Sequence, residues 1–169
     1  LLYASEPLFK GPVDWSRDGR WILVSQLDQE TSQNIWLLDS SGTKQPTVLI
    51  GGRGTDLGGW LSPNGRWIAY TTNDTGRLEL YVQAFPTPGR RVQISDQGAV
   101  ASWWSPDSRQ LTFLDDDRHT IWRVDVQLGE SFGSSVPKKL LTLPADTIFV
   151  DAMPDRQRFI ALSPELSGN

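Results

Sequence analysis

A serine in the pattern Gly-x-Ser-x-Gly is the first candidate for catalysis in this sequence. The pattern occurs as GESFG at residues 129–133, with Ser131 at its centre. In hydrolases that use it, a strand precedes the serine, a helix follows it, and the acid and the histidine come later in the chain. Here the downstream segment contains Pro137 and ends in a strand-like run, and the only histidine, His119, precedes the serine. We therefore expect no catalytic residue in this chain.

Two further segments could do chemistry. DDDRH (115–119) combines three carboxylates with an imidazole, which could hold a hard cation. It occupies the same place in a repeat as TNDTG (72–76), so we interpret it as a charged hairpin tip and predict neither a metal nor a cofactor. SRDGRW (16–21) resembles part of the Asp-box of sialidases, S-x-D-x-G-x-[ST]-W, but it is one residue short and lacks the Ser or Thr. We interpret it as a turn.

Four residues form the remaining candidate site, since they share one column of a sequence repeat, just before its turns: Asp14, Trp60, Trp103 and Asp151. Alternation along a strand places each on the face opposite its successor in the chain. Two indoles and two carboxylates near one opening could recognise a cation or a peptide. The alternative is that all four pack or hydrogen-bond between repeats.

Composition limits the classes of protein that are compatible with this chain. Its 169 residues are 38% hydrophobic and 21% charged, which is typical of a globular domain. No window approaches the roughly 18 apolar residues of a membrane-spanning helix, so direct membrane insertion is not expected. A net charge of −4 argues against a nucleic-acid partner, which would favour a basic surface. The absence of cysteine excludes disulfides and thiolate metal sites.

The elements that would position these residues are repeated. Four segments align at a spacing of about 45 residues: VDWSRDGRWILV (13–24), GWLSPNGRWIAY (59–70), SWWSPDSRQLTF (102–113) and DAMPDRQRFIAL (151–162). Downstream of the first three, two more motifs recur in the same order: NIWLLD, ELYVQA and TIWRVD, then TVLI, VQIS and LLTL. Three motifs recurring in one order indicate a true structural repeat.

Each repeat is predicted to form about four short strands, in the first repeat at 13–16, 20–25, 34–39 and 47–50. Aligned apolar residues such as Ile22, Ile68 and Leu111 have mostly uncharged neighbours, which indicates strands covered on both faces. The large aromatics Trp21, Trp67 and Trp122 suit a wedge between stacked sheets.

The turn after the first strand of each repeat has a defined chemistry. In SPNG (62–65) the proline presets φ, the asparagine bonds nearby backbone, and the glycine accepts a positive φ. Ser108 and Arg156 replace this glycine in the third and fourth repeats. We predict that those two turns carry strain or are of another type.

Four-stranded units of this length are typical of β-propeller blades. The predicted fold is all-β, with about three and a half blades at 13–50, 57–95, 100–143 and 148–162. Rings usually contain four to eight blades, and exposed edge strands invite aggregation. We therefore predict one partial propeller over 1–169, belonging to a larger ring whose missing N-terminal blades are its first partner.

The turn followed by [IL]-x-[YF], together with the later I-W-x-x-D strand, resembles the TolB-like β-propeller repeat. WSRDGRWILV, LSPNGRWIAY and WWSPDSRQLTFL carry this resemblance most clearly, and it covers about 13–162. The stretch 62–126 and the final DRQRFIAL also resemble the C-terminal propeller of bacterial receptor-type serine/threonine kinases. These resemblances imply a binding or sensing propeller, with any kinase domain upstream; the sequence itself contains no kinase motif.

Three functions remain open at the level of sequence. The first is a non-catalytic sensing or protein-interaction module of a larger bacterial protein, with a protein or peptide partner and a membrane anchor outside this chain, on the extracytoplasmic side. The second is the substrate-gating propeller of a prolyl oligopeptidase-type enzyme. The third is a periplasmic assembly protein of the TolB type.

Overall fold

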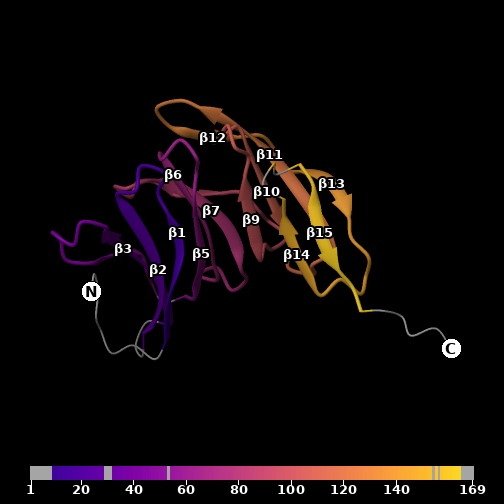
Figure 1. The fold of residues 1–169 in the computed structure, drawn as a ribbon. Coiled ribbons are helices and arrows are strands. Elements are labelled where there is room, and N and C mark those ends of the chain that lie inside the picture. Colours follow the sequence, from indigo (N-terminus) through magenta and orange to yellow (C-terminus); the bar gives the residue numbers. More distant parts are fainter. Residues whose placement is uncertain (1–8, 29–31, 53, 154, 156, 165–169) are drawn as a thin grey trace.

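The computed structural model describes residues 9–28, 32–52, 54–153, 155 and 157–164. Within these ranges the chain forms strands only, and no helix is present that could cross a membrane. The strands make antiparallel sheets that stand side by side along an arc, with the first described strands at one end of the arc and the last at the other (Figure 1). The predicted all-β fold built from propeller blades is therefore confirmed.

The first two blades have four strands each, hydrogen-bonded in chain order. Blade 1 contains β1 (Phe9–Trp15), β2 (Trp21–Asp28), β3 (Ser32–Asp39) and β4 (Thr47–Ile50). Blade 2 contains β5 (Asp56–Leu61), β6 (Trp67–Thr72), β7 (Glu79–Ala84) and β8 (Val92–Gln93).

Blade 3 has one strand more than its repeat predicts. It contains β9 (Ala101–Trp104), β10 (Gln110–Leu114), β11 (Thr120–Leu128), β12 (Phe132–Ser134) and β13 (Lys138–Thr142). Both β12 and β13 pair with the long strand β11, at different places along it. The last unit is the hairpin of β14 (Phe149–Ala152) and β15 (Phe159–Leu162), which we call the half-blade.

Three apolar cores lie between successive blades, as expected for strands covered on both faces. In β6, Ile68 and Tyr70 belong to the core shared with blade 1, whereas Trp67 and Ala69 belong to the core shared with blade 3. The third core joins blade 3 to the half-blade through Trp103, Leu114, Ile121 and Leu143. The predicted wedge residues Trp21, Trp67 and Trp122 all take part in such cores.

A serine braces the turn between the first two strands of blades 1 to 3. In blade 1, Ser16 Oγ donates to Asp18 Oδ1 (2.6 Å) and accepts the N–H of Trp21 (2.8 Å). Ser62 makes the same two contacts with Asn64 (2.7 Å) and Trp67 (3.0 Å). Ser105 makes them with Asp107 (2.6 Å) and Gln110 (2.8 Å). The turn is thus held by side chain to backbone bonds that are local in sequence.

The predicted strain in the third turn is confirmed. Ser108, which replaces glycine there, has φ of 63°, in the region that glycine normally occupies. Ser108 is also buried, and its Oγ accepts the N–H of Asn64 from blade 2 at 3.0 Å. This inter-blade bond helps to explain why a residue with a side chain stands at a glycine position. The corresponding Arg156 lies outside the described residues.

Candidate ligand-binding site

A hollow of about 500 Å³ lies where the first strands of the blades end and their turns begin. The first strands β1, β5 and β9 contact one another in sequence, so their ends converge at one place. The hollow is lined by all four predicted site residues: Asp14, Trp60, Trp103 and Asp151. The residue that follows the serine in each turn also lines it, namely the exposed Arg17 and Pro106 and the half-buried Pro63.

Asp14 connects blade 1 to blade 2. Its Oδ1 accepts the N–H of Trp15 at 2.8 Å, and its Oδ2 accepts the N–H of Leu61 at 2.7 Å. The carboxylate is half-buried, and the strand bulges between Pro12 and Asp14. A bulge re-aims the side chains that follow it, and here it accompanies a carboxylate directed at the next blade.

Trp103 and Asp151 make the equivalent connection between blade 3 and the half-blade. The indole Nε1 of Trp103 donates to Asp151 Oδ1 at 3.0 Å, and the same oxygen accepts the N–H of Ala152 at 2.7 Å. Trp103 is only 8% exposed and packs edge-on against Phe159, whereas Asp151 is exposed. The carboxylate therefore remains accessible from the hollow while the indole holds it in place.

The third link between blades involves Trp60, which is half-buried. Its carbonyl accepts the indole N–H of Trp104 at 3.0 Å, and its own ring lies against Gly58. Gly58 has φ of +75°, and a bulge separates it from Trp60. The chain thus makes room for the indole by omitting a side chain two residues earlier.

Two interpretations of the four predicted site residues came from the sequence: a binding site, or contacts between repeats. The structure shows features of both. The four residues link successive blades, as the packing alternative predicted, and they also line one hollow. Sequence reasoning did not include Trp15, because alternation places it on the opposite face; it lines the hollow as well and is 59% exposed. The site thus offers aromatic surface, two carboxylates and the guanidinium of Arg17, groups that can bind an aromatic or charged ligand.

The Gly-x-Ser-x-Gly pattern forms no nucleophile elbow. Ser131 lies in an exposed bend, and the chain continues directly into strand β12. His119 stands at the start of β11 and Ser131 beyond its end, and a strand of this length spans roughly 26 Å. The segment has a packing role instead: Phe132 lies edge-on against Trp67, with ring centroids 5.2 Å apart, and against Trp104 at 6.4 Å.

The acidic segment at 115–119 is a hairpin tip, in agreement with the sequence interpretation. Asp115 Oδ1 accepts the N–H groups of His119 (2.9 Å) and Thr120 (3.0 Å). Burial raises the pKa of Asp115, but these backbone hydrogen bonds, together with side-chain hydrogen bonds from Thr120 and Trp122, lower the pKa overall. Asp116 lies 3.8 Å from Arg77 of blade 2. In the part of the chain that the structure describes, no three acidic or histidine side chains are grouped as a metal site.

Replacing Gly58 by alanine should displace the indole of Trp60 and destabilise the protein by about 2 kcal/mol. A methyl group there would overlap Cζ3 of Trp60, and the backbone already has a positive φ. Urea unfolding measures the loss of stability, and tryptophan emission reports the displaced ring.

Gly65→Ala is the matched control, since Gly65 has φ of +70° but nothing within 4 Å of a new Cβ. It isolates the backbone cost, about 1 kcal/mol. If Gly58→Ala and Gly65→Ala lost the same amount of stability, the contact with Trp60 would contribute nothing to the effect.

Comparison with known proteins supports the fold. No protein-family model matches the sequence. Among solved structures, TolB from Acinetobacter baumannii superposes with a TM-score of 0.64 at 18% identity, over 83% of this chain and 34% of TolB. The β-propeller domain of the Trilobed protease from Pyrococcus furiosus gives 0.60 at 18% identity, over 90% of this chain and 48% of that one.

A third solved structure is also similar in fold at low sequence identity. The putative TolB from Agrobacterium tumefaciens gives a TM-score of 0.56 at 22% identity, over 82% of this chain and 52% of its own. The chain thus has the fold of TolB-like β-propellers and spans about a third to a half of the length of these neighbours.

Proposed function

We propose that this chain is a non-catalytic binding module for a protein or peptide. The partner would insert one cationic side chain into the hollow. The observation that carries the proposal is that Trp60, Trp103 and the carboxylates of Asp14 and Asp151 meet around one opening. A cationic group there would lie against aromatic faces and could pair with an exposed carboxylate, the combination that favours guanidinium and ammonium groups.

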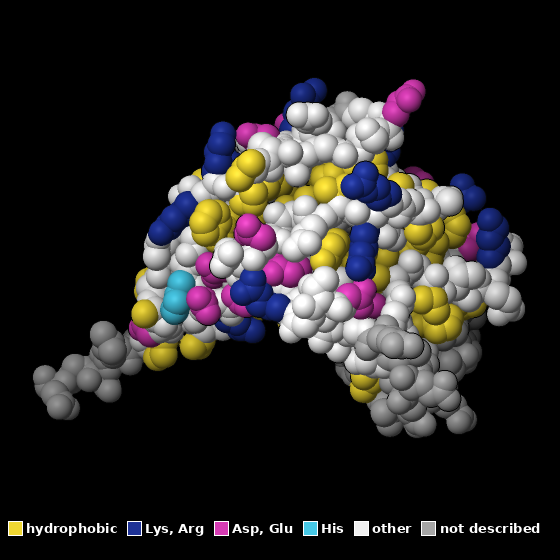
Figure 2. Space-filling model, turned by 180° about the vertical axis from the view of Figure 1, so that it is seen from behind, with side chains coloured by type: hydrophobic (Ala, Val, Ile, Leu, Met, Phe, Trp, Pro, Cys, Tyr) yellow, Lys and Arg dark blue, Asp and Glu magenta, His cyan; other side chains and the backbone are white. Residues whose placement is uncertain are grey.

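The overall charge of the chain supports a cationic ligand. The net charge is −4, which raises the local concentration of positively charged partners. On the face seen in Figure 2, acidic and basic side chains are interspersed. On that face, therefore, no single strongly acidic area would attract a cation, and the proposed preference rests on the hollow.

At a finer level, we propose that the module is the sensing end of a larger bacterial receptor-type serine/threonine kinase, on the extracytoplasmic side of the membrane. The support is the resemblance of residues 62–126 to the propellers of such kinases. In that setting the hollow would receive the external signal, and a kinase domain elsewhere in the protein would transmit it.

A second candidate is a propeller that gates access to a peptidase. The likeness to the propeller domain of the Trilobed protease favours it. The two functions predict different selectivity, because a binding hollow distinguishes peptides by charge, whereas a gate distinguishes them by size.

The test is the binding of two fluorescent pentapeptides that differ only in their central residue, Arg or Glu, measured by anisotropy at low and at physiological salt. We expect the Arg peptide alone to bind, and more weakly as salt is added. Asp151→Asn should weaken its binding about tenfold, because it removes a charge-assisted bond. The amide still has an oxygen to accept the Trp103 N–H, so the fold should persist.

Asp117→Asn is the control, since Asp117 is an exposed carboxylate at the far end of β10 and outside the hollow. It should leave the affinity unchanged. Equal binding of both peptides, or no effect of Asp151→Asn, would contradict the proposal. A second pair of peptides, of different length but both with a central Arg, tests the alternative: discrimination by length alone would favour the gate.

A further inference from the structure

A second, smaller pocket lies between blades 2 and 3, and we call it the side pocket. Its volume is about 200 Å³, and among the described residues it has no lining residue in common with the hollow. Phe113 and Trp122 stand opposite each other on β10 and β11 and pack in the core that blade 3 shares with blade 2. Phe113 is buried, whereas Trp122 is only half-buried. The lining of the side pocket consists of Asp96, Gln97, Phe113, Trp122, Val136 and Pro137.

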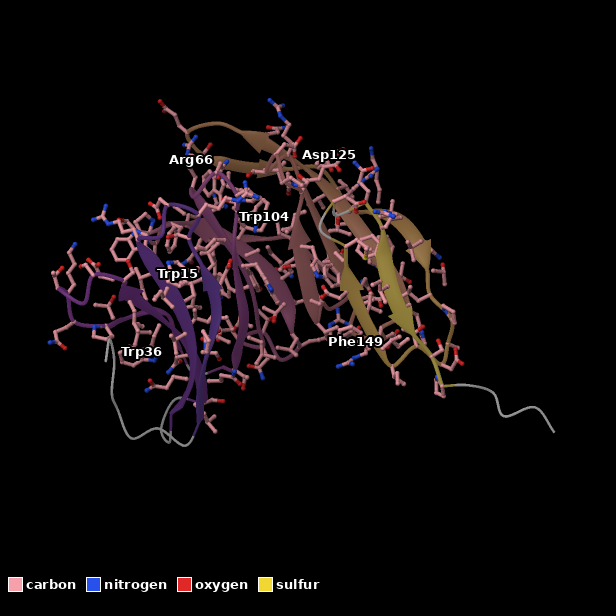
Figure 3. The ribbon with its side chains drawn as sticks, viewed as in Figure 1. Trp15, Trp36, Arg66, Trp104, Asp125 and Phe149 are labelled. Carbon is pink, nitrogen blue, oxygen red and sulfur yellow. The ribbon has the colours of Figure 1, made fainter. Side chains whose placement is uncertain are left out.

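The wall that blade 3 contributes is apolar and exposed, but its backbone is fixed. Val136 and Pro137 belong to the segment between β12 and β13, and Val136 is 80% exposed. The residue before it is tied to β11 at Asp125, which is labelled in Figure 3. The N–H of Ser135 donates to the carbonyl of Asp125 at 2.9 Å, and its Oγ accepts the N–H of Asp125 at 3.0 Å. An apolar side chain is thus displayed beside the pocket by hydrogen-bonded backbone.

The wall that blade 2 contributes is short and polar. Strand β8 has two residues, against four in β4 and five in β13, so blade 2 ends sooner than blade 3 at this outer edge. The connection that follows β8 brings the exposed side chains of Asp96 and Gln97 to the pocket. Arg77 donates to the carbonyl of Asp96 at 2.6 Å, and Glu79 accepts the N–H of Gly98 at 3.1 Å. Both walls are therefore held in place before any partner arrives.

The end of the side pocket near this connection is acidic. Trp122 donates from Nε1 to Asp115 Oδ2 at 3.4 Å, and Asp116 packs against the connection itself. On the outer side, Lys139 stands opposite Trp122 on β13. At this end of the blades the acidic residues outnumber the basic ones: Glu79, Asp96, Asp115, Asp116 and Asp117 against Arg77 and Arg118. A cationic group is therefore favoured beside Asp96 and disfavoured beside Lys139.

We propose that the side pocket binds one aliphatic side chain of a protein partner, in an extended segment that carries Lys or Arg two residues away. Residues two apart in an extended chain point to the same side. A leucine would cover the exposed surfaces of Trp122 and Val136, and burial of such apolar surface is favourable. The cation two residues away would then pair with Asp96 at the rim. This inference does not depend on what the hollow binds.

The test uses the whole chain labelled with fluorotryptophan and observed by fluorine NMR. Trp122→Phe and Trp60→Phe assign the resonances of the side pocket and of the hollow. The peptide Lys-Gly-Leu-Gly-Lys should move the Trp122 resonance, with a dissociation constant on the order of 1 mM. Alanine in place of the leucine should weaken binding at least tenfold. Glutamine in place of both lysines should weaken it about threefold.

Two variants at exposed residues test the two contacts without removing buried groups, and thermal melts check that each one folds. Val136→Ser should weaken binding of the lysine peptide about fivefold. Asp96→Asn should weaken it about threefold, and should leave binding of the glutamine peptide unchanged. Asp125→Asn is the matched control, at an exposed carboxylate of β11 outside the side pocket, and should have no effect.

The outcomes separate this proposal from the one for the hollow. A Trp122 resonance that ignores the peptide, a response equal for leucine and alanine, or equal effects of Asp96→Asn and Asp125→Asn would overturn it. A shift confined to Trp60 would also overturn it, and would support cation binding by the hollow. A shift of Trp122 without one of Trp60 would support the side pocket even if the hollow binds no cation.

Discussion

Replacing Glu79 by alanine is expected to lower the free energy of unfolding by about 3 kcal/mol. Glu79 is 4% exposed at the start of β7, and its carboxylate accepts hydrogen bonds from three groups. These are the guanidinium of Arg77 at 2.9 Å, the Ser95 hydroxyl and the N–H of Gly98 at 3.1 Å. The last two lie on the connection from blade 2 to blade 3, so one side chain fixes the position of that connection.

The loss is large because alanine would leave buried donors without an acceptor. Gly98 cannot move easily to find another, since Asp116 packs where its Cβ would be. Glu79→Gln keeps one accepting oxygen and should cost about half as much. Urea unfolding with Glu130→Ala as the exposed control would measure both. A loss below about 1 kcal/mol for alanine would show that the network is dispensable.

Replacing Asp56 by asparagine should raise stability at pH 7, by up to about 3 kcal/mol. Asp56 is 2% exposed at the start of β5, and its Oδ2 has no hydrogen-bond partner within the described chain. Burial is the main cause that raises the pKa of its carboxyl group to about 6; the nearby Asp74 acts in the same direction, while the hydrogen bond from Thr72 and the charge of Arg91 oppose the shift. The folded protein therefore carries an unfavourable charge at neutral pH, which the amide removes.

The same shift fixes the direction of the pH dependence. Because the pKa of Asp56 is higher in the folded than in the unfolded state, its stabilising effect is complete below about pH 4 and is lost as the pH rises through about 6. The difference in stability between Asp56→Asn and the original chain should thus grow over this range and level off above it. Asp146→Asn, at an exposed carboxylate, controls for the loss of one charge. A constant difference between pH 4 and 8 would contradict the assignment.

The blades and their turns could be predicted from the sequence because both depend on local chemistry that repeats. A Ser, an Asp or Asn two residues later and an apolar run give the same turn three times. Strain or another turn type at Ser108 could be predicted from its alignment with two glycines, Gly19 and Gly65, and the structure shows which of the two it is, since Ser108 keeps their positive φ. The four site residues could be placed together because one column of a repeat returns to the same end of each blade.

The remaining features depend on contacts that no repeat encodes. Strand β12 arises in a segment without a counterpart in blades 1 and 2, and Phe132 is fixed by Trp67 and Trp104 of two different blades. The buried carboxylates of Asp56 and Glu79 stand in unremarkable polar segments, so nothing in the sequence distinguished them from exposed ones. Trp15 was excluded from the site by strand alternation, which does not account for a hollow that reaches past the strand end.

The serine-braced turns separate the residues that hold the fold from the residues that are displayed. In each turn the brace uses the serine, the Asp or Asn, and the backbone, while the residue directly after the serine takes no part in it. Those residues are Arg17, Pro63 and Pro106, and all three line the hollow. If the hollow binds as proposed, substitution of Arg17 can therefore alter the ligand with little cost to folding, whereas Pro63 and Pro106 also preset φ in their turns. The first turn is then the most suitable place for laboratory selection of new binders.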